Sequence, residues 1–483
     1  MTVVAKPLPA QRVADAATLS ERSRAKPDTP VLTADGAVAA AIRGVWQASA
    51  YGYVLDLSEA RPRRFSVCGA GAWEHEEDGS PDLWFGVEAS GDRGVVTMHP
   101  LEPGFDVERL GALPPACAEP TDWTQTRLFG AVVATMAEFY PFFEVRGFDW
   151  EARVAALRPQ VTDGMADAAL FAVFESLFRG LGDGHVFMQA EIDGEGRLIR
   201  AEDRGLQGEL KAAFAAQSAV AEWPTFRRTW LRTLKGELYD GVLAGEQRGT
   251  ANERLIWGKA DERVGYLMIT GMHGYSTSDD IDENVRALHQ GLDEVLGELG
   301  ACDALIVDVS MNHGGADLFS LEIASRFADE KRLAFSKYPA KDPSLIRHRH
   351  VTPYVDRSPG AVMFTKPVYV VTHVDTASAA EIFTMAMRAL PHVTTVGRPT
   401  SGALSDILDK ELPNGWSFGL SNEVYTDHRG VCHEGRGIPP DVAMDIFDPE
   451  DITQHGHADA IAKIVEMAKQ RLAAEAAASD SGR

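Results

Sequence analysis

The chain has 483 residues, several times the roughly 150 of a typical domain, so about three compact domains are expected. It carries 47 basic and 71 acidic side chains, a formal net charge of −24, and 45% of its residues are hydrophobic. This negative charge repels phosphate backbones and anionic lipid surfaces, which argues against nucleic acid and membrane partners.

The amino-terminal segment lacks the apolar run of a secretory signal, and nowhere do 18 or more apolar residues occur together. We therefore expect a cytoplasmic protein. The cysteines contain no CxxC pair, which suits a reducing compartment and predicts no metal framework. A disulfide between Cys68 and Cys117 is the alternative for an exported chain.

The first half of the chain changes texture several times. Residues 1–35 are rich in Ala, Pro and charge and predict a mobile leader. Residues 36–118 alternate short aromatic or β-branched runs with Gly, Asp and Ser turns, which predicts an antiparallel β-domain. Residues 119–185 have a helical period that ends at Gly-Asp-Gly, and residues 186–258 have mixed, partly helical character.

Residues 259–450 predict a catalytic α/β core. The strand-like runs RVGYLMITGM, DALIVDVS and KPVYVVT are each followed by a helical stretch, and HVTTVG returns as a strand. Three such alternations in a row specify a parallel or mostly parallel sheet. Residues 451–483 predict a C-terminal helix and tail.

Ser378, in HVDTASAAEIF, falls where a buried strand gives way to a helix, so its side chain should project at the carboxyl edge of the sheet. An ordinary helix N-cap is the alternative interpretation. His373 and Asp375 lie nearby, but a general base must bring its ring nitrogen within about 3 Å of the serine oxygen. His373 ends the strand five residues earlier and should point elsewhere.

A second serine, Ser417, matches the sequence motif of a nucleophile elbow but not the secondary structure that this motif requires. GWSFG, which contains Ser417, fits the G-x-S-x-G nucleophile elbow, but that elbow requires a strand, a sharp turn and a helix. Here PNG predicts a hairpin turn and SFGLSNEVYTD predicts a strand.

Four motifs in order resemble the S41 serine peptidases, which include tail-specific and C-terminal processing proteases and the tricorn core protease. The resemblance covers residues 123–445. DALIVDVSMNHGGADL is similar to the family's strand and Asn-x-Gly-Gly turn, and KPVYVVTHVDTASAAEIF to its nucleophile segment. HEGRGIPPDV is similar to its closing motif, and GLGDGHVFM to its Asp-Gly-His segment.

The resemblance implies a crotonase/ClpP-like spiral β/α core with a helical domain, and Ser378 as the nucleophile. It also implies an oxyanion hole made by the backbone N–H of Gly314 or Gly315 together with that of Ala379. A helix N-terminus and a glycine turn both direct N–H groups at developing negative charge, and one such donor is worth roughly 10²- to 10³-fold in rate.

Members of the family use either a Ser/Lys dyad or a Ser/His/Glu arrangement. Ala403 stands where the dyad lysine would be, so the resemblance implies His185 as general base and Glu434 as the carboxylate that orients it. Gly184 replaces the serine that precedes the histidine in the tricorn type, and Asp183 is a second candidate orienter. The alternatives are a loop or helix-capping histidine and a surface carboxylate.

Other histidines carry weaker signals. His348 with His350 and His455 with His457 lack carboxylate or thiolate partners nearby, so solvated loop histidines are preferred over metal ligands. No P-loop and no G-x-G-x-x-G after a strand occurs, and the expected reaction needs no metal or organic cofactor. His313 and His433 are expected to line the cleft.

The function that the resemblance implies is a serine-type peptidase, a hydrolase of peptides or unfolded protein ends. The alternative is a catalytically silent protein on the same scaffold that binds hydrophobic ligands or peptides, as retinoid-binding relatives do. Residues 186–258 lack the carboxylate-binding loop of the PDZ module found in many relatives. A homo-oligomer is compatible with the sequence.

Overall fold

The computed structural model describes residues 27–59, 61–75, 83–88, 90–100, 104–118, 122–202, 205–216, 222–343, 354–448, 452–454 and 456–481. His348, His350, His455 and most of the predicted leader lie outside these residues. The contacts divide the chain into two compact units. Unit 1 is Met1–Ala201, Ser336–Thr352 and Asp406–Cys432, and unit 2 is Glu202–Phe335, Pro353–Ser405 and His433–Arg483.

An eight-stranded sheet forms the first part of unit 1, with the order β1-β6-β7-β8-β2-β3-β4-β5. Its neighbouring strands pair antiparallel, which confirms the predicted N-terminal β-domain. The sheet begins before residue 36, because β1 lies inside the predicted leader and pairs with β6. The strands are β1 (Thr29–Pro30), β2 (Val45–Ala48), β3 (Tyr53–Asp56), β4 (Arg63–Cys68), β5 (Gly71–Glu74), β6 (Trp84–Val87), β7 (Arg93–Thr97) and β8 (Phe105–Leu110).

Helices and a second antiparallel sheet complete the core of unit 1. Phe171 of α5 packs edge-on against Trp416, with ring centroids 5.7 Å apart. The second sheet has the order β10-β9-β21-β20, and β16 pairs with β22. These elements are α2 (Pro115–Ala118), α3 (Gln125–Phe139), α4 (Trp150–Leu157), α5 (Asp167–Phe178), β9 (Phe187–Ile192), β10 (Glu195–Arg200), β16 (Phe335–Pro339), β20 (Ile407–Glu411), β21 (Ser417–Ser421) and β22 (Glu423–Asp427).

Unit 2 is built on a seven-stranded sheet of order β11-β12-β13-β14-β18-β19-β23. From β13 to β23 the neighbours are parallel, which confirms the predicted α/β core. The strands are β11 (Arg248–Thr250), β12 (Leu255–Lys259), β13 (Val264–Ile269), β14 (Ala304–Asp308), β18 (Val368–Thr372), β19 (Val393–Gly397) and β23 (Val442–Ala443), and β15 (Arg332–Leu333) pairs with β17 (Tyr354–Val355) outside this sheet.

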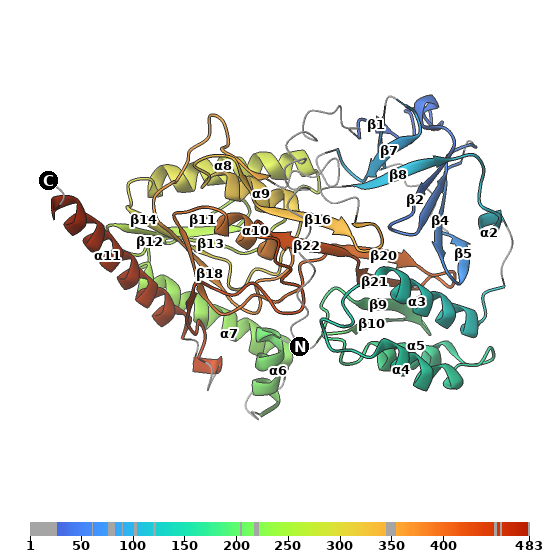
Figure 1. Ribbon diagram of the computed structural model, residues 1–483. Helices are drawn as coiled ribbons and strands as arrows, with labels where there is room; N and C mark the ends of the chain where they lie inside the picture. Colours follow the sequence, from blue (N-terminus) through green and yellow to red (C-terminus); the bar gives the residue numbers. More distant parts are fainter. Residues whose placement is uncertain are drawn as a thin grey trace. The chain divides into compact units, whose positions relative to one another are not determined.

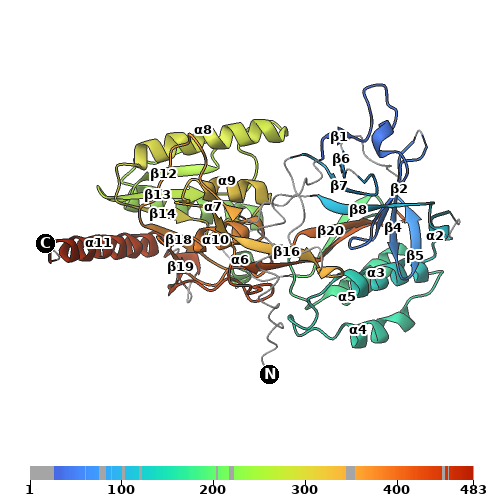
Figure 2. The same cartoon turned by 45° about the horizontal axis from the view of Figure 1, so that its top comes forward.

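Helices cover both faces of the seven-stranded sheet (Figures 1 and 2). α8 and α9 lie on one face, and α7 and α11 lie on the other. Because both faces of the sheet are covered, successive residues of its strands are fully buried and apolar. Examples are Leu305, Ile306 and Val307 of β14, and Val370 and Val371 of β18. The helices are α6 (Leu206–Ala216), α7 (Trp223–Glu237), α8 (Ile281–Leu299), α9 (Asp317–Ser325), α10 (Ala379–Arg388) and α11 (His457–Ser481).

Two sequence expectations concern the environment of the chain. Within the described residues, no helix is both long enough and apolar enough to cross a membrane. Cys68 and Cys117 are buried thiols rather than a disulfide, so the alternative pairing is not formed.

Candidate active site

Ser378 occupies a strained turn between β18 and α10 in unit 2. Its backbone has φ 57° and ψ −128°, whereas an N-cap residue normally has β-region dihedrals. A non-glycine residue in such a region costs on the order of 1–3 kcal/mol and persists only where its surroundings hold it. The Ser378 N–H donates to the carbonyl of Ala403 at 3.0 Å, and the Ala377 N–H donates to that of Asn312 at 3.1 Å. Ser378 is the N-cap residue of α10 and forms a capping box with Glu381, but in a backbone conformation that an ordinary N-cap does not adopt. The residue is half-buried.

A buried carboxylate, Glu381, fixes this turn from inside α10. Its oxygens accept hydrogen bonds from Thr400 Oγ1 at 2.5 Å, Gly402 N at 2.8 Å, Ala403 N at 2.9 Å and Ser378 N at 3.2 Å. Burial raises the pKa of Glu381 to about 7, while these hydrogen bonds act in the opposite direction. Glu381 thereby ties the strained serine to the 400–405 loop.

The glycine turn after β14 lies directly against Ser378. A Cβ atom added to Gly314, where φ is +93°, would be 2.7 Å from Ser378 Cβ and 2.9 Å from Ala379 N. The Gly314 N–H is already used, since it donates to Asn312 Oδ1 at 2.9 Å. The N–H groups of the exposed Gly315 and of Ala379 donate to no acceptor in the described part of the chain. Of the two predicted glycines, Gly315 therefore has the available donor.

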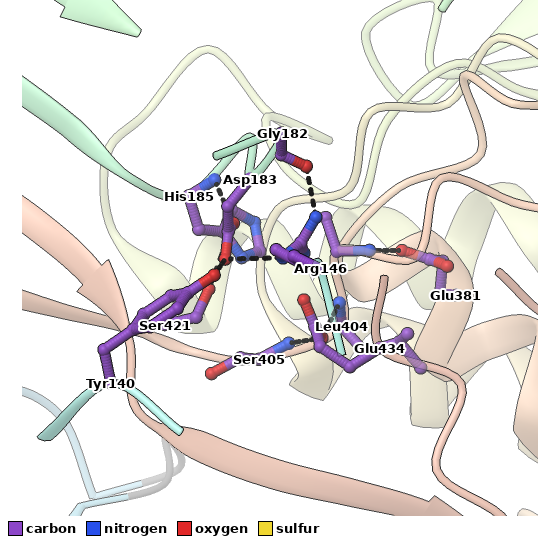
Figure 3. A network of polar contacts seen from close by, with 11 residues as sticks. Tyr140, Arg146, Gly182, Asp183, His185, Glu381, Leu404, Ser405, Ser421 and Glu434 are labelled. Atoms are coloured by element: carbon purple, nitrogen blue, oxygen red, sulfur yellow. Dashed lines mark hydrogen bonds and ion pairs between the residues drawn. The ribbon is translucent and has the colours of Figure 1, made fainter. Parts of the chain in front are cut away.

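Glu434 is a second buried carboxylate held by the same loop. Its Oε2 accepts the Leu404 N–H at 2.8 Å and the Ser405 N–H at 3.1 Å (Figure 3). It is 2% exposed, which rules out the alternative of a surface loop carboxylate. Four consecutive N–H groups, from Gly402 to Ser405, thus bind Glu381 and Glu434 in succession.

His185 and Asp183 lie in unit 1. The His185 N–H donates to Asp183 Oδ1 at 2.9 Å, and His185 is 9% exposed. Asp183 is fully buried, accepts Tyr140 OH at 2.8 Å and Ser421 Oγ at 3.2 Å, and lies 3.3 Å from Arg146 Nε (Figure 3). The Asp183 carboxylate therefore holds the backbone of His185.

The other two polar residues of HVDTASAAEIF are engaged elsewhere. The His373 ring is 1% exposed and packs edge-on against Phe447, with centroids 4.9 Å apart. Asp375 Oδ1 accepts the Leu206 N–H at 2.8 Å at the start of α6, and its Oδ2 lies 3.5 Å from His313 Nε2. His313 is exposed, whereas His433 is largely buried.

The preferred interpretation of His457 as a solvated loop histidine is wrong. Its side chain is fully buried, and its Nε2 lies 2.8 Å from Asp308 Oδ2 at the end of β14. The same carboxylate accepts Tyr266 OH at 2.7 Å, so His457 anchors the start of α11. The described residues contain no group of three or more His, Cys, Asp or Glu side chains suited to hold a metal ion.

Ser417 lies within a strand rather than on an elbow. It pairs with Glu411 of β20 and with Gln189 of β9, and β21 continues to Ser421 without a helix. The neighbouring Trp416 is buried among the aromatic residues of unit 1.

Unit 2 is an α/β domain with a strained serine at a strand-to-helix turn. Beside this serine lie two backbone N–H groups, those of Gly315 and Ala379, that donate to no acceptor in the described part of the chain. This arrangement is typical of a hydrolase with a serine nucleophile. Residues 263–444, which contain this serine, match the family model of peptidase family S41. The chain therefore carries a peptidase family S41 domain. The matched range includes the glycine turn and Glu434 but not His185.

Two solved structures are similar to this chain. A putative peptidase from Parabacteroides merdae is 25% identical over 72% of this chain and 97% of its own, with a TM-score of 0.52. Mature CPAF is 12% identical over 71% of this chain and 97% of its own, with a TM-score of 0.51, which shows likeness of fold. No protein in a curated collection matches the chain.

Proposed function

We propose that the protein is a serine peptidase that hydrolyses peptide bonds in peptides or unfolded protein ends, with Ser378 as its nucleophile. The observation that carries this proposal is the costly backbone conformation of Ser378 beside the open N–H groups of Gly315 and Ala379. Strained residues cluster at functional sites, and here the strain falls on a hydroxyl side chain beside two available N–H donors.

In the proposed reaction, Ser378 Oγ attacks the scissile carbonyl carbon and its proton passes to the His185 imidazole. The oxyanion that forms accepts hydrogen bonds from the N–H groups of Gly315 and Ala379. Collapse of this intermediate breaks the C–N bond, and the leaving amine takes the proton from His185. Water then hydrolyses the acyl-enzyme by the same steps and releases Ser378.

The role of His185 rests on the resemblance of its Asp-Gly-His segment, and the buried Asp183 network supports a fixed backbone at that position. We assign Glu434 as the carboxylate that orients the imidazole and stabilises its positive charge. Two N–H groups fix the position of its Oε2.

The test is hydrolysis of an unfolded protein, such as casein, followed by the release of free amines. We expect activity in the wild type and its loss in Ser378→Ala. Ser417→Ala is the matched control, because Ser417 lies on β21 within a G-x-S-x-G sequence and should retain activity. Equal activity in the wild type and in Ser378→Ala would refute the assignment of the nucleophile.

A further inference from the structure

The turn between β11 and β12 has a strained backbone. Ala251, Asn252 and Glu253 have φ values of 49°, 56° and 58°, three successive non-glycine residues in the left-handed region. L-amino acids normally visit this region singly, at about 1–2 kcal/mol per residue. Asn252 Nδ2 donates to the Gly274 carbonyl at 2.9 Å and so ties the turn to the loop after β13. This strained turn places the next residue, Arg254.

Arg254 is a half-buried cation without an acidic partner in the part of the chain that the structure describes. Its Nη2 lies 3.4 Å from His273 Nδ1 and would be 3.1 Å from a Cβ atom added to Gly274. Because a guanidinium only donates, His273 Nδ1 must accept and the neutral ring carries its proton on Nε2. Arg254 forms no ion pair with any described residue, and its buried Nε makes no hydrogen bond there. The carboxylate of Glu253 lies against Gly249 instead.

This missing partner is notable in a chain with 71 acidic side chains against 47 basic ones. A buried or half-buried guanidinium loses hydration, and an acceptor group normally compensates for that loss. A cation that is held by a strained turn and has no acidic partner among the described residues is suited to bind an acceptor group supplied by a ligand.

Arg254 belongs to the face of unit 2 that carries Ser378. The Met272 N–H donates to the Gly314 carbonyl at 2.9 Å, and the Ala316 N–H donates to the Met272 carbonyl at 2.9 Å. A Cβ atom added to Gly315 would be 3.2 Å from His273 Cβ. Gly314 in turn contacts Ser378, so contacts run without a break from Arg254 through His273 and the glycine turn to the serine. Both His273 and Gly315 are exposed, which leaves this face open to a ligand.

We propose that Arg254 binds a carboxylate of the substrate beside the Gly314–Gly315 turn. The proposal rests on the proposed peptidase function and names its substrate class: peptides with an acidic side chain, or a free carboxyl terminus, within a few residues of the scissile bond. A guanidinium suits this role because its planar fork binds both carboxylate oxygens at once. His273 holds the guanidinium in place, and Arg254 acts as a specificity-determining residue.

The experiment measures peptide binding without hydrolysis, in the Ser378→Ala variant, by fluorescence anisotropy. The probes are fluorescein-labelled decapeptides of Ala, Ser and Leu with one Glu, or one Gln, at each position in turn, each with a free or an amidated carboxyl terminus. We expect at least one acidic peptide to bind roughly 10- to 100-fold more tightly than its neutral match. Arg254→Gln should abolish this difference, and Arg254→Lys should retain part of it because the charge remains.

Arg248→Gln is the matched control. Arg248 lies on the same hairpin, stacks over Trp257 at 5.0 Å and is exposed, so its loss should leave the preference unchanged. Thermal unfolding of each variant checks that it is folded.

Peptides with free and with amidated carboxyl termini distinguish the two possible sources of the carboxylate. A preference that persists in amidated peptides assigns the carboxylate to a side chain, and one that requires a free end assigns it to the carboxyl terminus. Equal binding of acidic and neutral peptides, no binding of either, or a preference that survives Arg254→Gln would overturn the inference. Hydrolysis by the wild type without this preference overturns only the inference, whereas the preference without hydrolysis overturns only the proposed function.

Discussion

Replacement of Gly314 by Ala tests how closely the glycine turn controls Ser378. The new methyl group would meet Ser378 Cβ and the Ala377 carbonyl at 2.7 Å and Ala379 N at 2.9 Å, all shorter than normal contacts. The positive φ of +93° also costs an alanine about 1–2 kcal/mol. If the turn holds its place, overpacking costs a further 1–3 kcal/mol or so. If the turn moves by ~1 Å, the rate falls on the order of 10²-fold.

Gly360→Ala separates these two effects. Gly360 is in the same unit with a φ of +78°, but a Cβ atom there would meet nothing within 4 Å. The assay is the rate at which a fluorophosphonate labels Ser378, together with urea unfolding. We expect Gly360→Ala to lose stability alone and Gly314→Ala to lose labelling by about two orders of magnitude as well. Equal labelling rates in the two variants would refute the placement of the turn against the serine.

Three further outcomes are expected. Glu381→Gln should lower the free energy of unfolding by about 1–3 kcal/mol in urea titrations at pH 7, because its amide leaves at least one buried N–H without an acceptor; an unchanged midpoint would contradict this. Glu434→Gln should lower the rate of hydrolysis by up to about 10⁴-fold, as for a lost orienter, and an intact rate would exclude that role. Burial lowers the pKa of His373 from 6.5 to about 4. The stability from its neutral form is therefore present above pH 6.5 and declines by about 3 kcal/mol as the pH falls toward 4, and a decline of the same size in His373→Gln would contradict this.

The local order around Ser378 could be predicted from the sequence. Each strand and the helix after it are neighbours in the chain, so apolar runs and turn residues encode β14, β18 and α10 directly. For the same reason the sequence distinguished Ser417, which lies on β21, from a serine at a strand-to-helix turn.

One local feature was missed although a signal existed. Asp193 and Gly194 have φ values of 57° and 77° and join β9 to β10 as a two-residue hairpin loop. Asp-Gly between two strand-like runs is a strong hairpin signal. The charged residues of β10 and the helical stretches that follow concealed it in a region of mixed character.

Contacts between segments that are distant in the chain could not be predicted from the sequence. Residues 336–352 and 406–432 fall within the predicted core range but belong to unit 1. His457 contacts Asp308, which lies 149 positions earlier in the chain. Glu381 and Glu434 likewise accept hydrogen bonds from successive N–H groups of the 400–405 loop. These contacts depend on the path of the backbone, which the residue types do not encode.

The most direct test of the central claim is the intact mass of the protein after treatment with a fluorophosphonate, compared among the wild type, Ser378→Ala and His185→Ala. An activated serine predicts a single adduct on the wild type, none on Ser378→Ala and much slower labelling of His185→Ala. A folded wild type that takes up no adduct, or an adduct that persists in Ser378→Ala, would contradict the assignment of Ser378 as the nucleophile.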